Sequence, residues 1–264
     1  DNRFNIAMMK ITGTIITLNA EKYISRAIES LKHICDEIIV LDSESTDSTR
    51  RLAESVGAKV FTQPFLGDGK QKKKASEYSN NNWVFSLDAD EYLDSDLIEF
   101  VSKIDLDNES YDSYSFRRKN YCAEEWIKAA GFYPDNVTRL YNKSKVNYDI
   151  RADHAAVVSS RTYKSKSHII HNTYESMEEW VDKMNFRSSM SAKQLFIDGK
   201  KPSNIRPIIR GLFAFFKKLI IKGGILQGKN GFKVAITTMF NTYLKYIKLN
   251  DLHNQKDKQK NKTS

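Results

Sequence analysis

Two aspartates stand where an apolar run ends, in the segment WVFSLDADEYL, residues 83–93. Asp88 and Asp90 form a D-x-D pair. Carboxylate oxygens are preferred ligands of Mg²⁺ and Mn²⁺, and both ions also bind substrate phosphates. A cation held by this pair would offset the charge of a nucleoside diphosphate as it departs. The plainer alternative is that both aspartates cap a helix that begins near Asp94.

The segments before this pair alternate between strand and helix patterns. We expect strands at residues 11–18, 37–42, 58–63 and 83–87, and helices at about 21–33, from Thr46 or Asp47 as the cap to Gly57, and at 70–79. This alternation predicts an α/β fold with a parallel sheet and right-handed crossovers. Ligands bind outside the carboxyl ends of such strands. Asn19, Asp42 and Asp88 should therefore share one rim.

The pattern changes after about residue 110. SYDSYSFRRKNY predicts a strand, and EEWIKAAGFYPDNVTRLYNKS predicts a loop followed by a strand. From Ser176 the chain reads as helical, with breaks near residues 198–204 and 222–231. We expect a catalytic domain over residues 9–175, a helical extension over 176–250 and a disordered basic tail over 251–264. Residues 1–8 precede a Met9-Lys10 pair that looks like a natural start, and we expect them to stand outside the fold.

The composition of the 264 residues suits a globular protein, with 40% hydrophobic residues. Two cysteines, Cys35 and Cys122, are too few for a disulfide framework and favour a reducing compartment. We expect neither a signal peptide nor a transmembrane helix, because no run of about 18 apolar residues occurs. The charge is uneven: residues 1–100 carry 12 basic and 17 acidic side chains, whereas residues 201–264 carry 14 and 2.

Two ordinary nucleotide-binding patterns are missing from the sequence. The loop TLNAEK is not G-x-G-x-x-G, and G-x-x-x-x-G-K-[ST] does not occur. The lysine run KQKKKAS could neutralise nucleic-acid phosphates. It lies in the acidic half, without interleaved aromatic residues or a recognised RNA module. We therefore expect no nucleic-acid partner.

Several segments resemble successive motifs of inverting family 2 glycosyltransferases of the GT-A fold: TIITLNAEKYISRAIESL, DEIIVLDSESTDSTRRLAESVGAKVF, GDGKQKKKAS and WVFSLDADEYL. WIKAAGFYPDNVTRLY and HIIHNTY resemble, more narrowly, the lipopolysaccharide inner-core β-1,4-glucosyltransferase branch. The resemblance covers residues 10 to about 250. It implies a mostly parallel sheet flanked by helices, with a helical C-terminal extension.

The resemblance also implies roles for individual residues. Asp42 would hydrogen-bond the uracil, and Asp90, with Asp88, would bind Mg²⁺ or Mn²⁺. His171 would be a further metal or diphosphate contact, or a histidine paired within the fold. The residues expected in the nucleotide-sugar pocket are Thr17, Asn19, Glu21, Asp42, Ser43, Glu44, Gln71, Lys72 and Asp88.

An inverting transferase needs a general base for the acceptor hydroxyl. The family's His-Glu pair matches His154 and the next position, but that position is Ala155, which cannot accept a proton. Three explanations stay open: a variant inactivated by replacement of glutamate with Ala155, takeover by Asp153 or His154, or catalysis by Asp135. We rank Asp153 and His154 above Asp135, for which a turn position after Pro134 is slightly favoured over catalysis.

Aromatic and basic residues of the middle segment are candidate acceptor contacts. Trp126 and Tyr133 could stack on sugar faces, although such aromatics more often belong to a core. Arg139 could pair with an acceptor phosphate. Farther on, IRPIIRGLFAFFKKLIIKGGIL places apolar stripes beside lysines and arginines. That pattern suits docking on anionic lipid headgroups, or a helix packed on the catalytic domain.

These features predict a metal-dependent inverting hexosyltransferase. We expect transfer of a hexose, most simply glucose, from a UDP-sugar to a lipopolysaccharide-core or related glycan, by a bacterial cytoplasmic protein peripheral to the inner face of the cytoplasmic membrane. The alternatives are a protein or peptide glycosyltransferase of the same fold and a noncatalytic basic protein that binds membrane surfaces.

Overall fold

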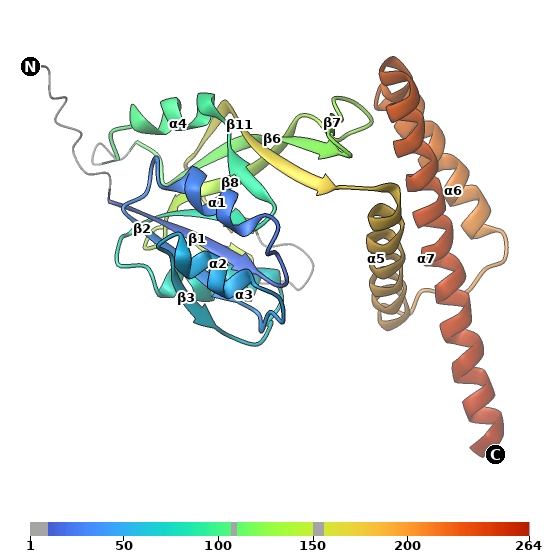
Figure 1. Ribbon diagram of the computed structural model, residues 1–264. Helices are drawn as coiled ribbons and strands as arrows, with labels where there is room; N and C mark the ends of the chain where they lie inside the picture. Colours follow the sequence, from blue (N-terminus) through green and yellow to red (C-terminus); the bar gives the residue numbers. More distant parts are fainter. Residues whose placement is uncertain (1–9, 107–109, 150–155, 264) are drawn as a thin grey trace, which may run out of the picture. The chain divides into compact units, whose positions relative to one another are not determined.

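The computed structural model describes residues 10–106, 110–149 and 156–263 (Figure 1). These residues form two compact units. The first comprises the described residues within 10–119 and 135–171, and the second comprises residues 120–134 and 172–263. The second unit thus includes the segment 120–134, which the sequence had assigned to the catalytic domain. This segment joins the helical unit because its backbone groups hydrogen-bond to side chains of Lys218 and Gln227.

The strands of the main sheet run in the order β3-β2-β1-β4-β8-β6-β11-β5, with β7 paired to β6. The strands β3, β2, β1 and β4 are parallel, whereas β8 runs antiparallel to both β4 and β6. Their bounds are β1 Ile11–Thr17, β2 Glu37–Asp42, β3 Lys59–Thr62, β4 Trp83–Asp88, β5 Glu91–Leu93, β6 Ser113–Cys122, β7 Glu125–Trp126, β8 Asp135–Asn142 and β11 Thr162–Tyr174. A separate pair joins β9 (Asn147–Asp149) to β10 (Ala156–Val158).

The helices of the first unit are α1 Ile24–Leu31, α2 Thr49–Ser55, α3 Asp68–Glu77 and α4 Ser95–Ser102. Helix α1 forms because apolar residues recur at helical spacing, and its four buried side chains join the core under the sheet: Ile24, Ala27, Ile28 and Leu31. The strand β1 approaches α1 closely at Gly13, where a Cβ atom would lie 3.0 Å from the Leu31 side chain.

The second unit holds α5 Met177–Ile197, α6 Arg206–Phe216, the π-helix η1 Lys217–Ile221, the 3₁₀ helix η2 Gly224–Gln227 and α7 Gly228–Thr263. Ser176 caps α5 by accepting a hydrogen bond from Glu179 N, as expected for a helix that begins there. Both α5 and α6 pack against α7 (Figure 1). Among the described residues, no helix is long and apolar enough to cross a membrane.

The end of α7 differs from the disordered tail expected for residues 251–264. The helix continues through Thr263. The tail sequence NQKDKQKNKTS lacks proline and glycine, so no residue within it interrupts the backbone hydrogen bonds that α7 has already begun.

Candidate active site

The rim expected from the strand ends is present in the first unit. Strand β1 lies between β2 and β4, with Thr17 beside Asp42 and Ile16 beside Asp88. The carboxyl ends of these parallel strands therefore meet at one edge of the sheet. Asn19 follows two residues after the end of β1. The sequence correctly predicted this convergence, because parallel strands joined by helical crossovers must point the same way.

The loops after β1 and β2 are tied together by hydrogen bonds. The buried Asp42 carboxylate accepts bonds from Ser45 N at 2.9 Å and Ser45 Oγ at 2.5 Å. Ser45 Oγ in turn accepts a bond from Asn19 N at 2.8 Å. Asp42 thus holds the loop after β2 in place through both of its carboxylate oxygens.

The solvent-exposed residues Asn19 and Glu21 also link the loops after β1 and β2. Asn19 Oδ1 accepts a bond from Thr46 N at 2.9 Å, and Glu21 Oε2 accepts one from Ser48 N at 2.9 Å. Asn19 and Glu44 both adopt positive φ, at 50° and 66°. Non-glycine residues of this conformation recur at functional sites.

A buried hydroxyl at the rim has no hydrogen-bond partner within the described part of the chain. It is Thr17 Oγ1, at the last position of β1. A buried hydroxyl without a hydrogen bond lowers the stability of the folded state, so we expect a ligand or a water to bond Thr17 Oγ1.

Gln71, in α3, is fully buried beneath the loop after β2. It donates to Ser43 Oγ at 3.1 Å and to Gln63 O at 3.3 Å, and it accepts from Leu66 N at 3.2 Å. These three bonds tie α3 to the loop after β2 and to the segment 63–66.

Charges of alternating sign form a chain along the rim. Lys72 Nζ lies 2.6 Å from Asp88 Oδ1, and Arg139 lies 2.6 Å from Asp88 Oδ2 and 2.6 Å from Glu91 Oε1. Burial alone would raise the pKa of Asp88, but Arg139 and then Lys72 hold this pKa far below its usual range. Asp88 is therefore a carboxylate with a cation on each oxygen.

The chain continues to the start of β8. Arg118 contacts Glu91 Oε1 at 3.2 Å and Asp135 Oδ2 at 2.7 Å. Glu91 also accepts a hydrogen bond from Asp88 N at 3.1 Å, which closes the turn between β4 and β5. Neither Glu91 nor Arg118 is among the site residues expected from the sequence. Glu91 could have been found as the third acid of the segment DADE, whereas nothing in FRRKN indicated which arginine faces the rim.

Asp90 and His171 form a second feature of this edge. Strands β5 and β11 pair with His171 opposite Glu91, and His171 Nε2 lies 3.5 Å from Asp90 Oδ2. Two ligand atoms at about 2.1 Å from one octahedral ion and at right angles lie about 3 Å apart. The pair therefore fits a shared divalent cation after a small adjustment. Both oxygens of Asp88 already contact cationic side chains, which leaves Asp90 as the more available carboxylate of the D-x-D pair.

Arg139 does not occupy the acceptor position expected for it. Its guanidinium is buried between Asp88 and Glu91, where it donates hydrogen bonds to both carboxylates. Trp126 and Tyr133 belong to the second unit, where their rings meet edge to face at 5.3 Å. Asp135 is paired with Arg118.

The three residues expected around the family's His-Glu position, Asp153, His154 and Ala155, lie outside the described residues. The helix-capping alternative for the D-x-D pair is wrong, since Asp94 caps α4 by accepting from Ser95 N at 2.8 Å.

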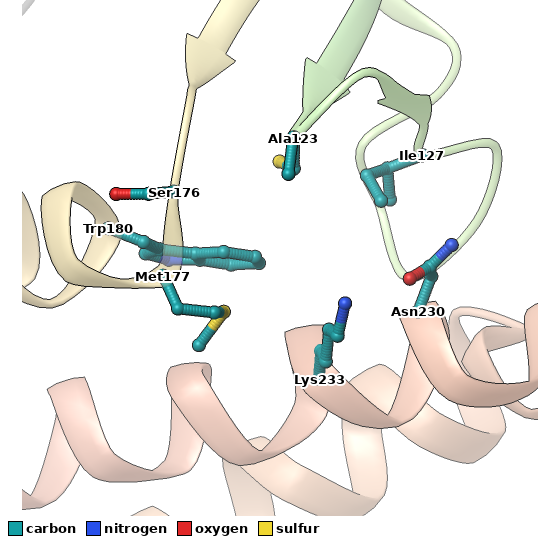
Figure 2. A pocket seen from close by; sticks show the side chains of 8 residues that line it. Ala123, Ile127, Ser176, Met177, Trp180, Asn230 and Lys233 are labelled. Atoms are coloured by element: carbon teal, nitrogen blue, oxygen red, sulfur yellow. The ribbon is translucent and has the colours of Figure 1, made fainter.

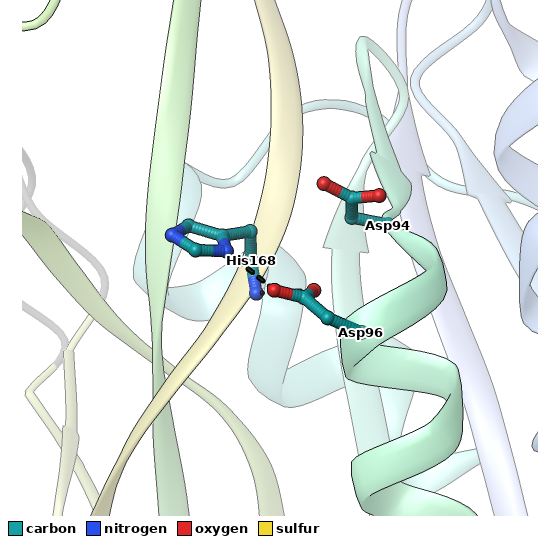
Figure 3. A group of neighbouring side chains, drawn as sticks. All are labelled: Asp94, Asp96 and His168. Atoms are coloured by element: carbon teal, nitrogen blue, oxygen red, sulfur yellow. Dashed lines mark hydrogen bonds and ion pairs between the residues drawn. The ribbon is translucent and has the colours of Figure 1, made fainter.

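Two further groupings are not extensions of this rim. Asp94, Asp96 and His168 come together beside α4 (Figure 3), but Asp94 is held by Ser95 and by Lys119 at 2.6 Å. In the second unit, a pocket near Cys122 and Trp180 (Figure 2) has a volume of about 20 Å³. That volume suits one water rather than a sugar.

Comparisons with known proteins bear on this site. The family model described as Glycosyl transferase family 2 matches residues 14–169. An uncharacterized glycosyltransferase of Rickettsia bellii is 37% identical over 256 residues, which cover 92% of this chain and 87% of that protein. The lipopolysaccharide core biosynthesis glycosyltransferase LpsC of Rhizobium meliloti is 28% identical over 262 residues, with 94% of each chain covered.

Among solved structures, the chain is similar to glucosyl-3-phosphoglycerate synthase from Mycobacterium tuberculosis in complex with Mn²⁺, UDP and glucosyl-3-phosphoglycerate. The TM-score is 0.35 and the identity 26%, over 44% of this chain and 45% of that one. The rim, the mixed sheet flanked by helices and the matched family model agree on the GT-A fold predicted from sequence.

Proposed function

Because the chain belongs to glycosyltransferase family 2, we propose that it transfers a hexose, with glucose as the expected sugar, from a UDP-sugar to a lipopolysaccharide-core or related glycan. The observation that carries this proposal is the rim itself. One edge of the sheet holds a metal-compatible pair, Asp90 and His171, an ionised Asp88 and a Thr17 hydroxyl that no described residue hydrogen-bonds. The similarity to LpsC supports the choice of acceptor.

Different residues of the rim would bind the metal and the diphosphate of the donor. Asp90 and His171 would hold Mg²⁺ or Mn²⁺, which supplies charge that offsets the departing diphosphate. Lys72 and Arg139 hold Asp88 in its charged form and in one orientation. Lys72 is the cation that can most readily change its ion-pair partner. Its flexible side chain allows Nζ to turn from Asp88 to a phosphate oxygen when the donor binds.

Transfer with inversion requires a base that takes the acceptor proton opposite the leaving group. We keep Asp153 and His154 as the first candidates and Asp135 as the second, because Asp135 already bonds Arg118. A glutamate at position 155 would complete the family pattern, so the chain can also be an inactivated variant. Replacing Ala155 with glutamate tests this reading: a rise in sugar transfer supports it, and an unchanged rate removes it.

The donor site is tested by substitution at the rim. Asp90→Asn should remove the part of UDP affinity that depends on Mn²⁺, because a neutral amide is a weaker ligand for a hard cation. The matched control is Asp96→Asn, an exposed acid on α4. Calorimetric titration of UDP with and without Mn²⁺ measures both. Equal metal-dependent affinity in both variants would contradict the assignment of Asp90, and no such affinity in the unchanged protein would favour a noncatalytic surface-binding protein.

The proposed acceptor also implies where the protein acts in the cell. We place the protein peripherally on the inner face of the cytoplasmic membrane, since a glycan carried on a lipid is presented at that surface. The basic helical end supports this view, with its lysines and arginines beside exposed apolar side chains.

A further inference from the structure

Helix α6 presents an apolar stripe to solvent. Exposed side chains recur three or four residues apart, from Ile205 at 65% exposure to Phe213 at 61%. The complete stripe is Ile205 at the N-cap of α6, then Ile208, Ile209, Leu212, Phe213 and Phe216 of α6, and Ile220 of η1. The opposite side of α6 packs on α7 through Pro207 and Gly211, which are buried. A Cβ atom at Gly211 would lie 3.3 Å from Met239 O, so the two helices touch closely. The apolar stripe is thus the face of α6 that α7 leaves uncovered.

The exposed apolar surface continues beyond α6. Ile221, Ile225 and Leu226 of the η1–η2 segment are 70%, 64% and 89% exposed. Exposed apolar surface of this extent marks an interaction site on a folded protein. We call the α6 stripe together with these three residues the apolar face.

Charge identifies the occupant of the apolar face. Residues 199–250 contain 11 lysines and arginines and no aspartate or glutamate. A second copy of the same face would bring like charges together, whereas anionic lipid headgroups would neutralise them. Apolar residues inserted among the lipids and cations at the headgroups are the arrangement of an interfacial helix.

The η1–η2 segment also holds the loop that carries Trp126. Gln227 Nε2 donates to Trp126 O at 2.8 Å, while Gln227 Oε1 accepts from Ala129 N at 2.8 Å. Lys218 Nζ donates to Ala130 O at 2.7 Å, and Ala130 N donates to Lys222 O at 2.8 Å. These four bonds attach residues 126–130 to the segment that precedes α7.

We propose that the apolar face docks on an anionic bilayer. Docking restricts the motion of the η1–η2 segment, and the four hydrogen bonds transmit this restriction to residues 126–130. Leu226 is the most exposed apolar residue of the face, and its neighbour Gln227 makes two of the four bonds. Restriction of the segment by lipid therefore restricts the loop. The inference deepens the proposed function and rests on it for one point only, the use of Trp126 as an acceptor contact.

Docking is tested with the full chain and vesicles of phosphatidylcholine, alone or mixed with phosphatidylglycerol. The double variant Ile209→Glu, Phe213→Glu should bind mixed vesicles at least about tenfold more weakly, because two inserted apolar groups become charged. Phe186→Glu is the matched control, as Phe186 is 68% exposed on α5. Its vesicle binding should stay unchanged. Equal binding of both variants, or wild-type binding indifferent to phosphatidylglycerol, would overturn the docking face.

A second copy as the occupant gives a different result. The wild-type chain would then sediment as a dimer without vesicles, and the double variant would sediment as a monomer. That outcome would replace the bilayer with self-association.

The coupling is tested by hydrogen exchange at the amides of Ala129 and Ala130. Mixed vesicles should slow exchange at both amides in the wild-type protein. In Gln227→Ala, vesicle binding should persist while the slowing is lost at Ala129, whose amide donates to Gln227 Oε1, whereas Ala130 keeps its bond to Lys222 O. Gln194→Ala, an exposed glutamine change on α5, should behave as wild type. Slowing at the Ala129 amide that survives Gln227→Ala, or a bound wild-type protein with no slowing at either amide, would refute the coupling.

These measurements need no sugar transfer. A titration of UDP and Mn²⁺ without vesicles reports on the rim of the first unit alone. A protein that binds vesicles but not UDP would contradict the proposed function and not the docking face. A protein that binds UDP but not vesicles would contradict the docking face and not the proposed function.

Discussion

The charge chain at the rim predicts a large and specific cost for removing Arg139. The change Arg139→Met keeps much of the side-chain volume and removes the cation that lies 2.6 Å from both Asp88 and Glu91. The Glu91 side chain has 0% exposure, so water cannot replace the lost partner.

The expected magnitude follows from burial. Leaving one member of a buried ion pair uncompensated costs about 3–5 kcal/mol. Arg118 still contacts Glu91 at 3.2 Å, and this favours the lower end of the range. We therefore expect the free energy of unfolding to fall by about 3 kcal/mol. Adding Glu91→Gln should recover part of the loss, since the amide carries no charge to leave unpaired.

The assay must report on the first unit by itself, because a chain with two compact units need not unfold in one step. Hydrogen exchange of β4 and β8 amides across a urea series does so. With a slope of about 2 kcal/mol per molar urea, the transition midpoint should fall by roughly 1.5 M.

Two outcomes would refute the reasoning. One is a loss below about 1 kcal/mol for Arg139→Met, the range of an exposed pair. The other is an additive double variant, in which Glu91→Gln and Arg139→Met together cost the sum of their separate effects.

Two further predictions concern pH and thiol reactivity. The pKa of Asp88 in the folded state lies below its unfolded value of about 3.9. Its stabilising contribution is therefore complete above that value and is lost as the pH falls through the folded pKa. Unfolding free energies between about pH 5 and pH 3 should decline less steeply in Asp88→Asn, and parallel curves would argue against the ion pairs. Burial raises the pKa of Cys122 to about 12, so its thiolate is scarce near neutral pH. In a Cys35→Ser background, iodoacetamide should modify Cys122 at a rate that follows unfolding, and rapid modification of the native protein would contradict its burial.

Much of the first unit follows from local sequence patterns. Apolar runs and helical spacing mark β1, α1, β2 and β4, and the handedness of crossovers brings Thr17, Asp42 and Asp88 to one edge. The start of α5 at Ser176 is equally local, because a hydroxyl cap precedes the helix. Such features depend on residues close together in the chain.

Long-range pairing decided the rest. His171 meets Asp90 only because β11 pairs antiparallel with β5, and Arg139 turns inward only because β8 lies beside β4. The sequence indicates that Arg139 forms an ion pair with an anion. It does not show whether that anion is a substrate group or Asp88. Strand register sets those distances, and register is fixed by the packing of the whole sheet. The sequence by itself therefore determined which strand ends form the rim, and the tertiary structure decided which charges meet there.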